Sequence, residues 1–176
     1  MLHDPSRFVP AAPADLKAAM RQLAGAVSVI TAGLGDARTG ATVTSAHSLS
    51  VDPETMLVSI NRSSSSWPAI RDGGFFCVNV LAASQIAVAD RFAGRGGVKG
   101  AARYEGAEWI TLATGAGALV GALASIDCEV EHVVERHSHA LIFGAVRSIV
   151  VGPPGPALLY AQGRYAALDL AAARAD

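Results

Sequence analysis

Four consecutive serines, residues 63–66, follow Arg62 and precede Pro68 in the segment SINRSSSSWPAI. Because proline lacks an N–H, it fits the first turn of a helix, so a helix is predicted to begin here with Ser66 as its N-cap. The N-terminus of a helix carries unpaired N–H groups and a partial positive charge, and both favour a phosphate. The other serine hydroxyls would add donors, and Arg62 would add charge. The segment therefore predicts a phosphate site, and a flexible loop with an ordinary serine N-cap is the alternative.

A second polar segment, TVTSAHSLS at residues 42–50, is rich in hydroxyl side chains. A strand with one face on the core and the other in water has little need for so many hydroxyls in a row. A polar, ring-shaped ligand lying along the backbone would explain them. The alternative is a solvent-facing edge strand, in which threonine is favoured in any case.

Two histidines, His137 and His139, stand two positions apart in the segment ERHSHALIFG. On a strand this spacing places both rings on one face, where they could bind a metal. No third ligand is evident, because Cys77 and Cys128 lie isolated in apolar, strand-like segments and are interpreted as buried thiols. We therefore predict no metal site and favour a single histidine beside a redox or proton-transfer centre. The alternative is an exposed pair at the start of a strand.

The composition limits the classes of function. Hydrophobic residues make up 51% and charged residues 16% of the 176 residues, against about 25% charged residues in typical soluble domains. Such a chain is expected to bury an apolar surface in an oligomer. The formal net charge of −1 and the lack of a basic patch argue against a nucleic-acid partner. The chain also lacks glycine-rich nucleotide motifs, a nucleophile-elbow motif and paired carboxylates, so kinase and hydrolase functions lose their usual support.

One uncharged segment, residues 109–126, is long enough to cross a membrane. Its glycines, and the strict alternation at residues 124–131 with Ser125 and Asp127 on the polar side, instead predict a half-buried strand. Residues 1–10 lack the apolar core of a signal peptide. We therefore expect no membrane partner and a cytoplasmic location.

Hydrophobic periodicity and turn residues predict many short strands with a few helices. The predicted strands are residues 26–33, 55–62, 75–81, 122–134, 140–151 and 157–160, and residues 41–51 are predicted as a further strand or as a strand followed by a loop. The predicted helices are residues 13–24, 67–74 and 84–94, the last with Ser84 as N-cap and Gly94 as terminator. Residues 94–109 are predicted to be a mobile surface loop, and residues 166–176 fit either a strand or a helix. This order of elements predicts one mainly β domain, an antiparallel barrel with helical covers.

Taken in order, these segments resemble the flavin reductase family of split-barrel flavoproteins, small NAD(P)H:flavin oxidoreductases that supply reduced flavin to two-component monooxygenases. The resemblance covers residues 16–168 through the pieces MRQLAGAVSVITA, GATVTSAHSLSVDPETMLVSINRSSSSWPAI, GGFFCVNVLAASQIAVADRFAG, GALASIDCEV, HALIFGAVRSI and LLYAQGRYAAL. It implies a split antiparallel β-barrel of Greek-key topology in one domain, residues 1–176 with a core at 14–168. It also implies a homodimer with flavin bound in a groove at the interface.

The resemblance further implies roles for individual residues. It places the flavin ring and ribityl chain along Thr42, Thr44 and Ser45, and the phosphate among Asn61, Ser63, Ser64 and Ser66. It places Asn79 in the wall of the site, Phe92 near the flavin and His139 beside the nicotinamide. One departure is the pair His137-Ser138, which replaces the Gly-Asp that is usual in the family.

The implied activity is transfer of a hydride from NADH or NADPH to FMN, with FAD as the alternative flavin and a flavin-dependent monooxygenase as the expected partner. Because the two rings react directly once they are stacked, few side chains need to perform acid–base chemistry. One alternative is a flavin-bound reductase of a dedicated acceptor, such as a corrinoid in cobalamin synthesis or an acceptor in pyrimidine degradation. Another is a non-enzymatic split-barrel protein that binds flavin or haem.

Overall fold

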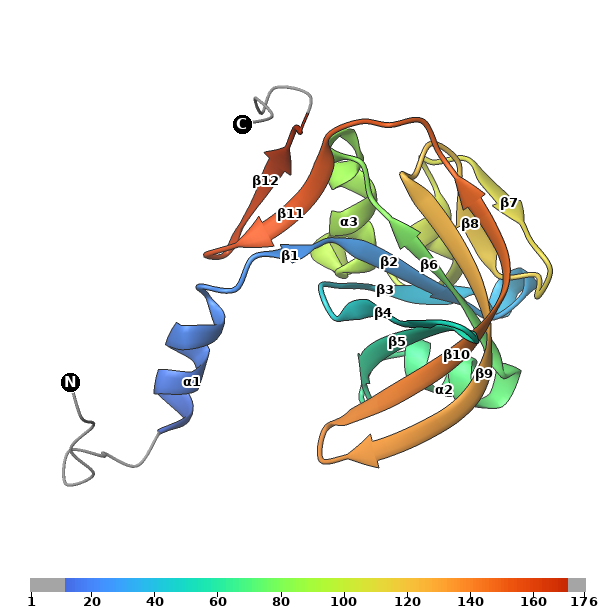
Figure 1. Ribbon diagram of the computed structural model, residues 1–176, viewed down its shortest axis with the longest axis horizontal. Helices are drawn as coiled ribbons and strands as arrows, with labels where there is room; N and C mark the ends of the chain where they lie inside the picture. Colours follow the sequence, from blue (N-terminus) through green and yellow to red (C-terminus); the bar gives the residue numbers. More distant parts are fainter. Residues whose placement is uncertain (1–11, 171–176) are drawn as a thin grey trace.

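The computed structural model describes residues 12–170, which form a curled sheet with helices at its periphery (Figure 1). The strands are β1 (Gly25–Ala26), β2 (Ser28–Ala32), β3 (Thr39–Val43), β4 (Ala46–Val51), β5 (Glu54–Asn61), β6 (Phe75–Val80), β7 (Trp109–Thr111), β8 (Gly117–Leu119), β9 (Ala124–Arg136), β10 (His139–Val151), β11 (Ala157–Ala161) and β12 (Arg164–Leu168). The α-helices are α1 (Pro13–Met20), α2 (Ser66–Gly73) and α3 (Ile86–Phe92), and the 3₁₀ turns are η2 (Gly35–Ala37), η3 (Ala83–Gln85), η4 (Arg95–Gly97) and η5 (Gly100–Tyr104). The prediction of a mainly β fold is confirmed.

The barrel arises from the way the largest sheet closes on itself. Within the described residues, seven strands pair antiparallel in the order β3-β2-β6-β9-β10-β5-β4, so β3 and β4 lie at opposite edges. Only Thr44 and Ser45 separate these two strands in the sequence. Three Cα steps span at most about 11 Å, so the sheet must curl until its edges approach each other. Residues 41–51, predicted as a strand or as a strand followed by a loop, instead belong to two strands on opposite edges of the sheet, joined by Thr44 and Ser45.

Among the described residues, buried apolar side chains form three clusters, of which the two larger ones pack under the helices. The first lies inside the curled sheet and under α2, and it includes Ile30, Phe76 and Ile142. The second lies under α3 and includes Phe92, which is 2% exposed. Gly40 in β3 allows this ring to approach the strand, because a Cβ at Gly40 would lie 2.7 Å from Phe92 Cε1. The clusters thereby fix both helices against the barrel.

The glycine-rich segment at residues 94–109 is pinned to the barrel, and the prediction of a loose surface loop is wrong. It forms η4 and η5, and Tyr104 at its end is buried with 3% exposure. The Tyr104 hydroxyl donates a hydrogen bond to the Thr39 carbonyl (2.8 Å), and its ring packs against Trp109 with centroids 4.7 Å apart. The Arg91 guanidinium donates to the Ala102 carbonyl. The buried Tyr104 ring and its contact with Trp109 therefore hold this segment in place despite its many glycines.

Several helix boundaries differ from the predictions. α3 begins at Ile86 with Gln85 as N-cap, since η3 occupies the preceding turn, so Ser84 is not the N-cap. Gly94, with φ of +78°, ends the helix as predicted. α1 ends at Met20 and buries none of its side chains against the described part of the chain. Figure 1 shows it standing away from the barrel.

The alternating segment at residues 124–131 forms the start of β9, as predicted, but its polar face is not exposed there. Ser125 and Asp127 are both buried, because β8 and the turn before it cover them. Asp127 Oδ2 accepts a hydrogen bond from the Thr114 N–H (2.7 Å) and Oδ1 accepts one from the Thr114 hydroxyl (2.5 Å). Among the described residues, no helix combines the length and apolarity needed to cross a bilayer.

The C-terminal segment forms a strand over Arg164–Leu168, paired antiparallel with β11. This settles the choice between strand and helix for residues 166–168, while residues 171–176 lie outside the described residues. β1, β11 and β12 make a separate small sheet that leads back to the body through a bridge between Ala82 and Ala157.

Candidate active site

One end of the barrel collects the polar segments that the sequence singled out. β4 and β5 pair so that Ala46 lies opposite Val58, which puts the β3–β4 junction beside the end of β5. β10 and β5 pair so that His139 lies opposite Asn61. The serine run follows Asn61 directly. Segments far apart in the sequence therefore meet along a single rim.

Hydrogen bonds within the turn give the serine run a defined shape. Asn61 Oδ1 accepts hydrogen bonds from the Ser63 N–H and the Ser63 hydroxyl, both at 2.9 Å. The hydroxyls of Ser64 and Ser66 are 2.5 Å apart, and the Ser66 N–H donates to Ser64 Oγ (3.1 Å). Ser66 is the first residue of α2 and is buried, and Ser65 precedes it as N-cap. The predicted role of Ser66 as N-cap is wrong, because the Ser64 hydroxyl accepts the bond at this helix start.

This turn forms one wall of a groove of about 490 Å³, which we call the cationic groove. Its lining residues are Ala41, Thr42, Ser63, Ser64, Ser65, Phe92, Ala93, Lys99 and Arg103. Lys99 and Arg103 form no ion pair within residues 12–170. Both come from the glycine-rich segment at residues 94–109, which was not predicted to contribute to a site.

The Arg103 side chain is oriented by backbone carbonyls. It donates to the Val98 carbonyl through Nε (3.2 Å) and to the Gly40 carbonyl through Nη1. Burial lowers the pKa of Arg103 from its ordinary value, although an arginine remains protonated in proteins. A partly desolvated cation gains from an anionic partner, so the groove suits a phosphate.

Arg62 does not serve the groove, contrary to the expectation from its place in the sequence. Its guanidinium forms an ion pair with Glu135 (2.6 Å) and donates to the His137 carbonyl (3.1 Å). These contacts hold the β9–β10 hairpin against the end of β5.

A smaller groove of about 230 Å³ adjoins the first and shares Thr42 and Ala93 with it. We call it the aromatic groove, and its other lining residues are Val27, Val43, Thr44, Arg95, Tyr160 and Tyr165. The two tyrosine rings meet edge to face with centroids 5.4 Å apart, and the Arg95 guanidinium lies 5.5 Å from the Tyr165 centroid. An apolar, aromatic groove next to a cationic one suits a ligand with a planar ring at one end and a phosphate at the other.

Thr42 connects the two grooves, and Thr44 lines the aromatic one. The Thr42 hydroxyl donates to the Ala89 carbonyl of α3 (2.6 Å), which fixes the edge of β3 against that helix. Ser45 lines neither groove, because its hydroxyl donates to the Ser59 carbonyl (2.9 Å) and holds the closing corner of the barrel. Phe92 lines the cationic groove from below, in edge-to-face contact with Tyr104 (5.1 Å).

Asn79 is the predicted site residue that the structure leaves out of both grooves. It is completely buried in β6, and its amide nitrogen donates to the Val29 carbonyl (3.1 Å). Its carbonyl oxygen accepts from the Leu119 N–H (2.7 Å) and the Ser125 hydroxyl (2.8 Å). With these partners inside the barrel, Asn79 joins β2, β6, β8 and β9 and is a structural residue.

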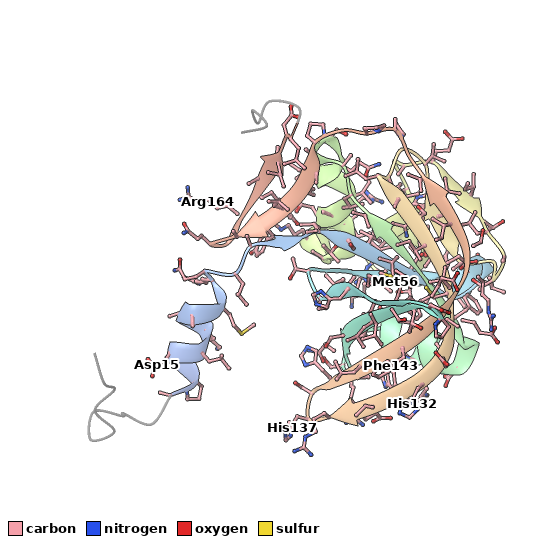
Figure 2. All side chains as sticks on the ribbon, viewed as in Figure 1. Asp15, Met56, His132, His137, Phe143 and Arg164 are labelled. Atoms are coloured by element: carbon pink, nitrogen blue, oxygen red, sulfur yellow. The ribbon has the colours of Figure 1, made fainter. Side chains whose placement is uncertain are left out.

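The two histidines do not share a strand face. His137 lies in the turn between β9 and β10 with φ of +52°, and Figure 2 shows it at the tip of this hairpin. His139 is the first residue of β10, exposed at the rim beside Asn61, with Nδ1 2.9 Å from the Ser138 hydroxyl. It reaches the neighbourhood of the serine turn without lining either groove.

Comparison with known proteins identifies the fold and its class. The model of the flavin reductase like domain matches residues 20–169. This chain belongs to the flavin reductase family. The FMN reductase (NADH) RutF 2 of Methylorubrum extorquens strain PA1 is 40% identical over 153 residues, which cover 85% of this chain and 86% of that protein. The FMN reductase (NADH) RutF of Variovorax paradoxus strain S110 is 35% identical over 162 residues, which cover 92% and 89%.

Solved structures of flavin reductases share the same architecture. BorF, the flavin reductase component of a bacterial two-component tryptophan halogenase, superposes with a TM-score of 0.82 at 28% identity. The alignment covers 90% of this chain and 99% of BorF. The predictions of the family and of the split-barrel fold are therefore confirmed.

Proposed function

We propose that this chain is an NADH-dependent FMN reductase that passes reduced flavin to a partner oxygenase. The observation that carries this proposal is the pair of adjoining grooves, one cationic and one aromatic, joined at Thr42. Their chemistry matches the phosphate and the ring of FMN. The relatives named FMN reductase (NADH) support the choice of flavin and nucleotide.

The residues present fit FMN in a specific way. The N–H and hydroxyl of Ser65, together with the charges of Lys99 and Arg103, would hold the phosphate, while Ser63 donates to Asn61 and shapes the turn. The isoalloxazine ring would lie against Thr44 and the tyrosines of the aromatic groove. When bound, FMN supplies the ring atom that accepts the hydride of NADH. The protein holds the flavin in place and shields one face of its ring from water.

His139 is proposed to orient the nicotinamide and not to transfer a proton. Its support is its place on the rim, opposite Asn61 and one strand away from the serine turn. The histidine is exposed and its ring nitrogen is already bonded to Ser138. Such a residue can position a substrate through a contact and has no need to transfer a proton.

A homodimer and a cytoplasmic location are part of the same proposal. Large apolar side chains remain exposed on α1, on β4 and at the end of β10: Leu16 61%, Met20 56%, Leu49 53%, Val51 83%, Ile149 53% and Val151 79%. Covering them in a second copy of the chain accounts for the low charged fraction of 16%. The description of BorF as one component of a halogenase supports a separate oxygenase as the user of reduced flavin.

The test is direct reduction of flavin by the purified protein. The protein is mixed anaerobically with FMN, and NADH or NADPH is added while the flavin absorbance is followed. Bleaching that is faster with NADH than with NADPH, and that needs the protein, is the expected result. Flavin that binds but is not reduced would favour the non-enzymatic alternative, and no flavin binding at all would refute the proposal.

A further inference from the structure

One charged side chain, Arg95, lines the aromatic groove among the described residues. The other side chains of this groove are apolar, hydroxyl-bearing or aromatic. The cations of the adjoining cationic groove, Lys99 and Arg103, line the same wall space as the serine turn. The proposed flavin site therefore holds its cations in two places, and Arg95 is the one beside the space for the ring.

The backbone turns Arg95 back toward α3, the helix that precedes it. α3 ends at Phe92, and Gly94 follows with φ of +78°, a left-handed conformation that glycine adopts without a steric penalty. Gly96, with φ of +71°, continues the turn. Nη1 of Arg95 thereby comes within 3.1 Å of Oδ1 of Asp90, which lies in the last turn of α3.

Asp90 compensates part of the charge of Arg95. Its Oδ1 atom is buried and accepts no well-aligned hydrogen bond from the described residues, so the ion pair with Arg95 offsets its loss of water. The Arg95 guanidinium also lies 5.5 Å from the Tyr165 ring centroid. Burial raises the pKa of the Tyr165 hydroxyl, and its hydrogen bond to Asp90 adds to this rise. Arg95 is thus held between a carboxylate and an aromatic ring in the wall of the groove.

Hydride transfer changes the charge of a flavin ring and leaves the charge of its phosphate as it was. A hydride carries one proton and two electrons, so its transfer turns NADH into NAD⁺ and leaves a negative charge on the reduced ring in neutral to alkaline solution. Cations beside the phosphate meet the same charge before and after this step. A cation beside the ring meets a neutral group before it and an anion after it, and therefore stabilises the reduced form selectively.

We propose that Arg95 favours reduced FMN over oxidised FMN in this site and that Asp90 limits this preference. The inference rests on the proposed function, because it takes the flavin ring to lie in the aromatic groove. Arg95 stabilises the negative charge that the hydride brings. Asp90 acts through Arg95 as a positioning residue, and it neutralises part of the arginine charge, so reduced FMN can still leave for the partner oxygenase.

The experiment measures the affinity of both oxidation states of FMN in variants of this pair. Anaerobic calorimetric titration gives the dissociation constants for oxidised FMN and for FMN reduced with dithionite, and a reference dye gives the midpoint potential of the bound flavin. None of these readouts depends on turnover. Arg95→Gln removes the charge, Arg95→Lys keeps it, and Asp90→Asn removes the compensating carboxylate.

Arg71→Gln is the matched control. Arg71 also forms an ion pair with a carboxylate, that of Asp72 (2.7 Å), and its side chain is 54% exposed against 58% for Arg95. It lines neither the aromatic groove nor the cationic groove. The control therefore removes an arginine of the same kind from a place where no flavin ring is expected.

The two charge changes should act in opposite directions. Arg95→Gln should raise the dissociation constant for reduced FMN about fivefold, a modest factor because solvent screens a partly exposed charge, and should leave that for oxidised FMN within about twofold. A fivefold change lowers the midpoint potential of bound FMN by about 20 mV, since tenfold corresponds to about 30 mV for two electrons. Asp90→Asn should tighten the binding of reduced FMN and raise the potential. Arg95→Lys should stay close to the unaltered protein, and Arg71→Gln should change none of these values.

The results separate failure of the inference from failure of the proposed function. Equal losses for both oxidation states in Arg95→Gln, or no loss for either, would overturn the inference. A lower potential in Asp90→Asn, or an Arg95→Lys variant as impaired as Arg95→Gln, would overturn it as well. Lys99→Gln should weaken both oxidation states equally, because Lys99 lines the groove of the phosphate, and a selective loss there would contradict the assignment of Arg95. If the unaltered protein binds neither oxidation state of FMN, the proposed function itself fails.

Discussion

At the scale of single residues, the charge of Lys99 should matter for the affinity of FMN. Lys99 is exposed, so solvent screening limits its contribution, and we expect Lys99→Gln to raise the dissociation constant roughly fivefold. Lys99→Glu should raise it more, because a carboxylate repels the phosphate. Titration with FMN at low and high salt measures both effects, and the loss should shrink as salt increases. Arg62→Gln is the control, since Arg62 is committed to Glu135, and a larger effect there would contradict the site.

The contrast between Lys99 and Arg62 shows how far the sequence could lead at this scale. The serine run, Thr42 and Thr44 could be singled out from residue type alone, because many hydroxyl side chains stand close together in these two segments. Which cation faces the serines depends on the burial of Tyr104, because Tyr104 holds the segment that carries Lys99 and Arg103 against β3. Arg103 follows Ser63 by about 40 residues in the sequence. No local pattern encodes that contact. Arg62, the arginine nearest to the serines in the sequence, therefore does not line the cationic groove, whereas Arg103 does.

The two cysteines should be inert in the folded protein. Burial, followed by the nearby charge of Asp127, raises the pKa of Cys128 to about 12 and raises that of Cys77 as well. Only the thiolate reacts, and a pKa raised to that level leaves roughly one thiolate in ten thousand at pH 8. We expect no labelling by a thiol reagent at pH 8 until denaturant is added, when both thiols should react. Rapid labelling of either thiol under native conditions would contradict the burial.

At the scale of elements, the tip of the β9–β10 hairpin holds one residue, His137, in an unfavourable backbone conformation. His137 has φ of +52°, a region that glycine adopts without the steric penalty of a Cβ. His137→Gly should therefore raise the free energy of unfolding by about 0.5–1 kcal/mol, and the bond from Arg62 to the carbonyl of residue 137 would remain. Urea unfolding measures the change. Ser138→Gly, at a position without positive φ, should lower the stability, and a gain there would contradict this account.

Most elements were predictable from periodicity, but their roles depended on pairing that lies outside any local window. The alternation at the start of β9 predicted a solvent face for Ser125 and Asp127, and β8 covers that face instead. Asn79 was expected in the wall of the site because the family resemblance placed it there. In the structure, the Asn79 side-chain amide forms hydrogen bonds with backbone groups of neighbouring strands and so holds four strands together. A lone polar residue in a strand could not distinguish these two uses.

At the scale of the whole molecule, the barrel alone does not account for the apolar composition. α1 buries no side chain against the described chain, and a hydrogen bond from the Gln162 N–H to the Arg21 carbonyl (2.9 Å) connects its C-terminal end to the β11–β12 turn. An isolated eight-residue helix is marginal in water. In the proposed homodimer, a second copy of the chain would cover α1 with the exposed apolar side chains of β4 and β10 and so stabilise the helix.

If the proposed homodimer forms, substitutions in α1 should weaken it without unfolding the barrel. Leu16 and Met20 lie one helical turn apart on α1 and are 61% and 56% exposed in the protomer. If a partner covers them, each loses about 1.5–3 kcal/mol of burial when replaced by a charged residue, so the Leu16→Glu/Met20→Glu variant should raise the dimer dissociation constant by at least about a hundredfold. Sedimentation across a range of concentrations measures this constant, and Lys17→Ala on the same helix is the control. Because neither apolar side chain contacts the core, the variant should keep its far-UV circular dichroism apart from the helix itself, and an unchanged dissociation constant would show that α1 lies outside the interface.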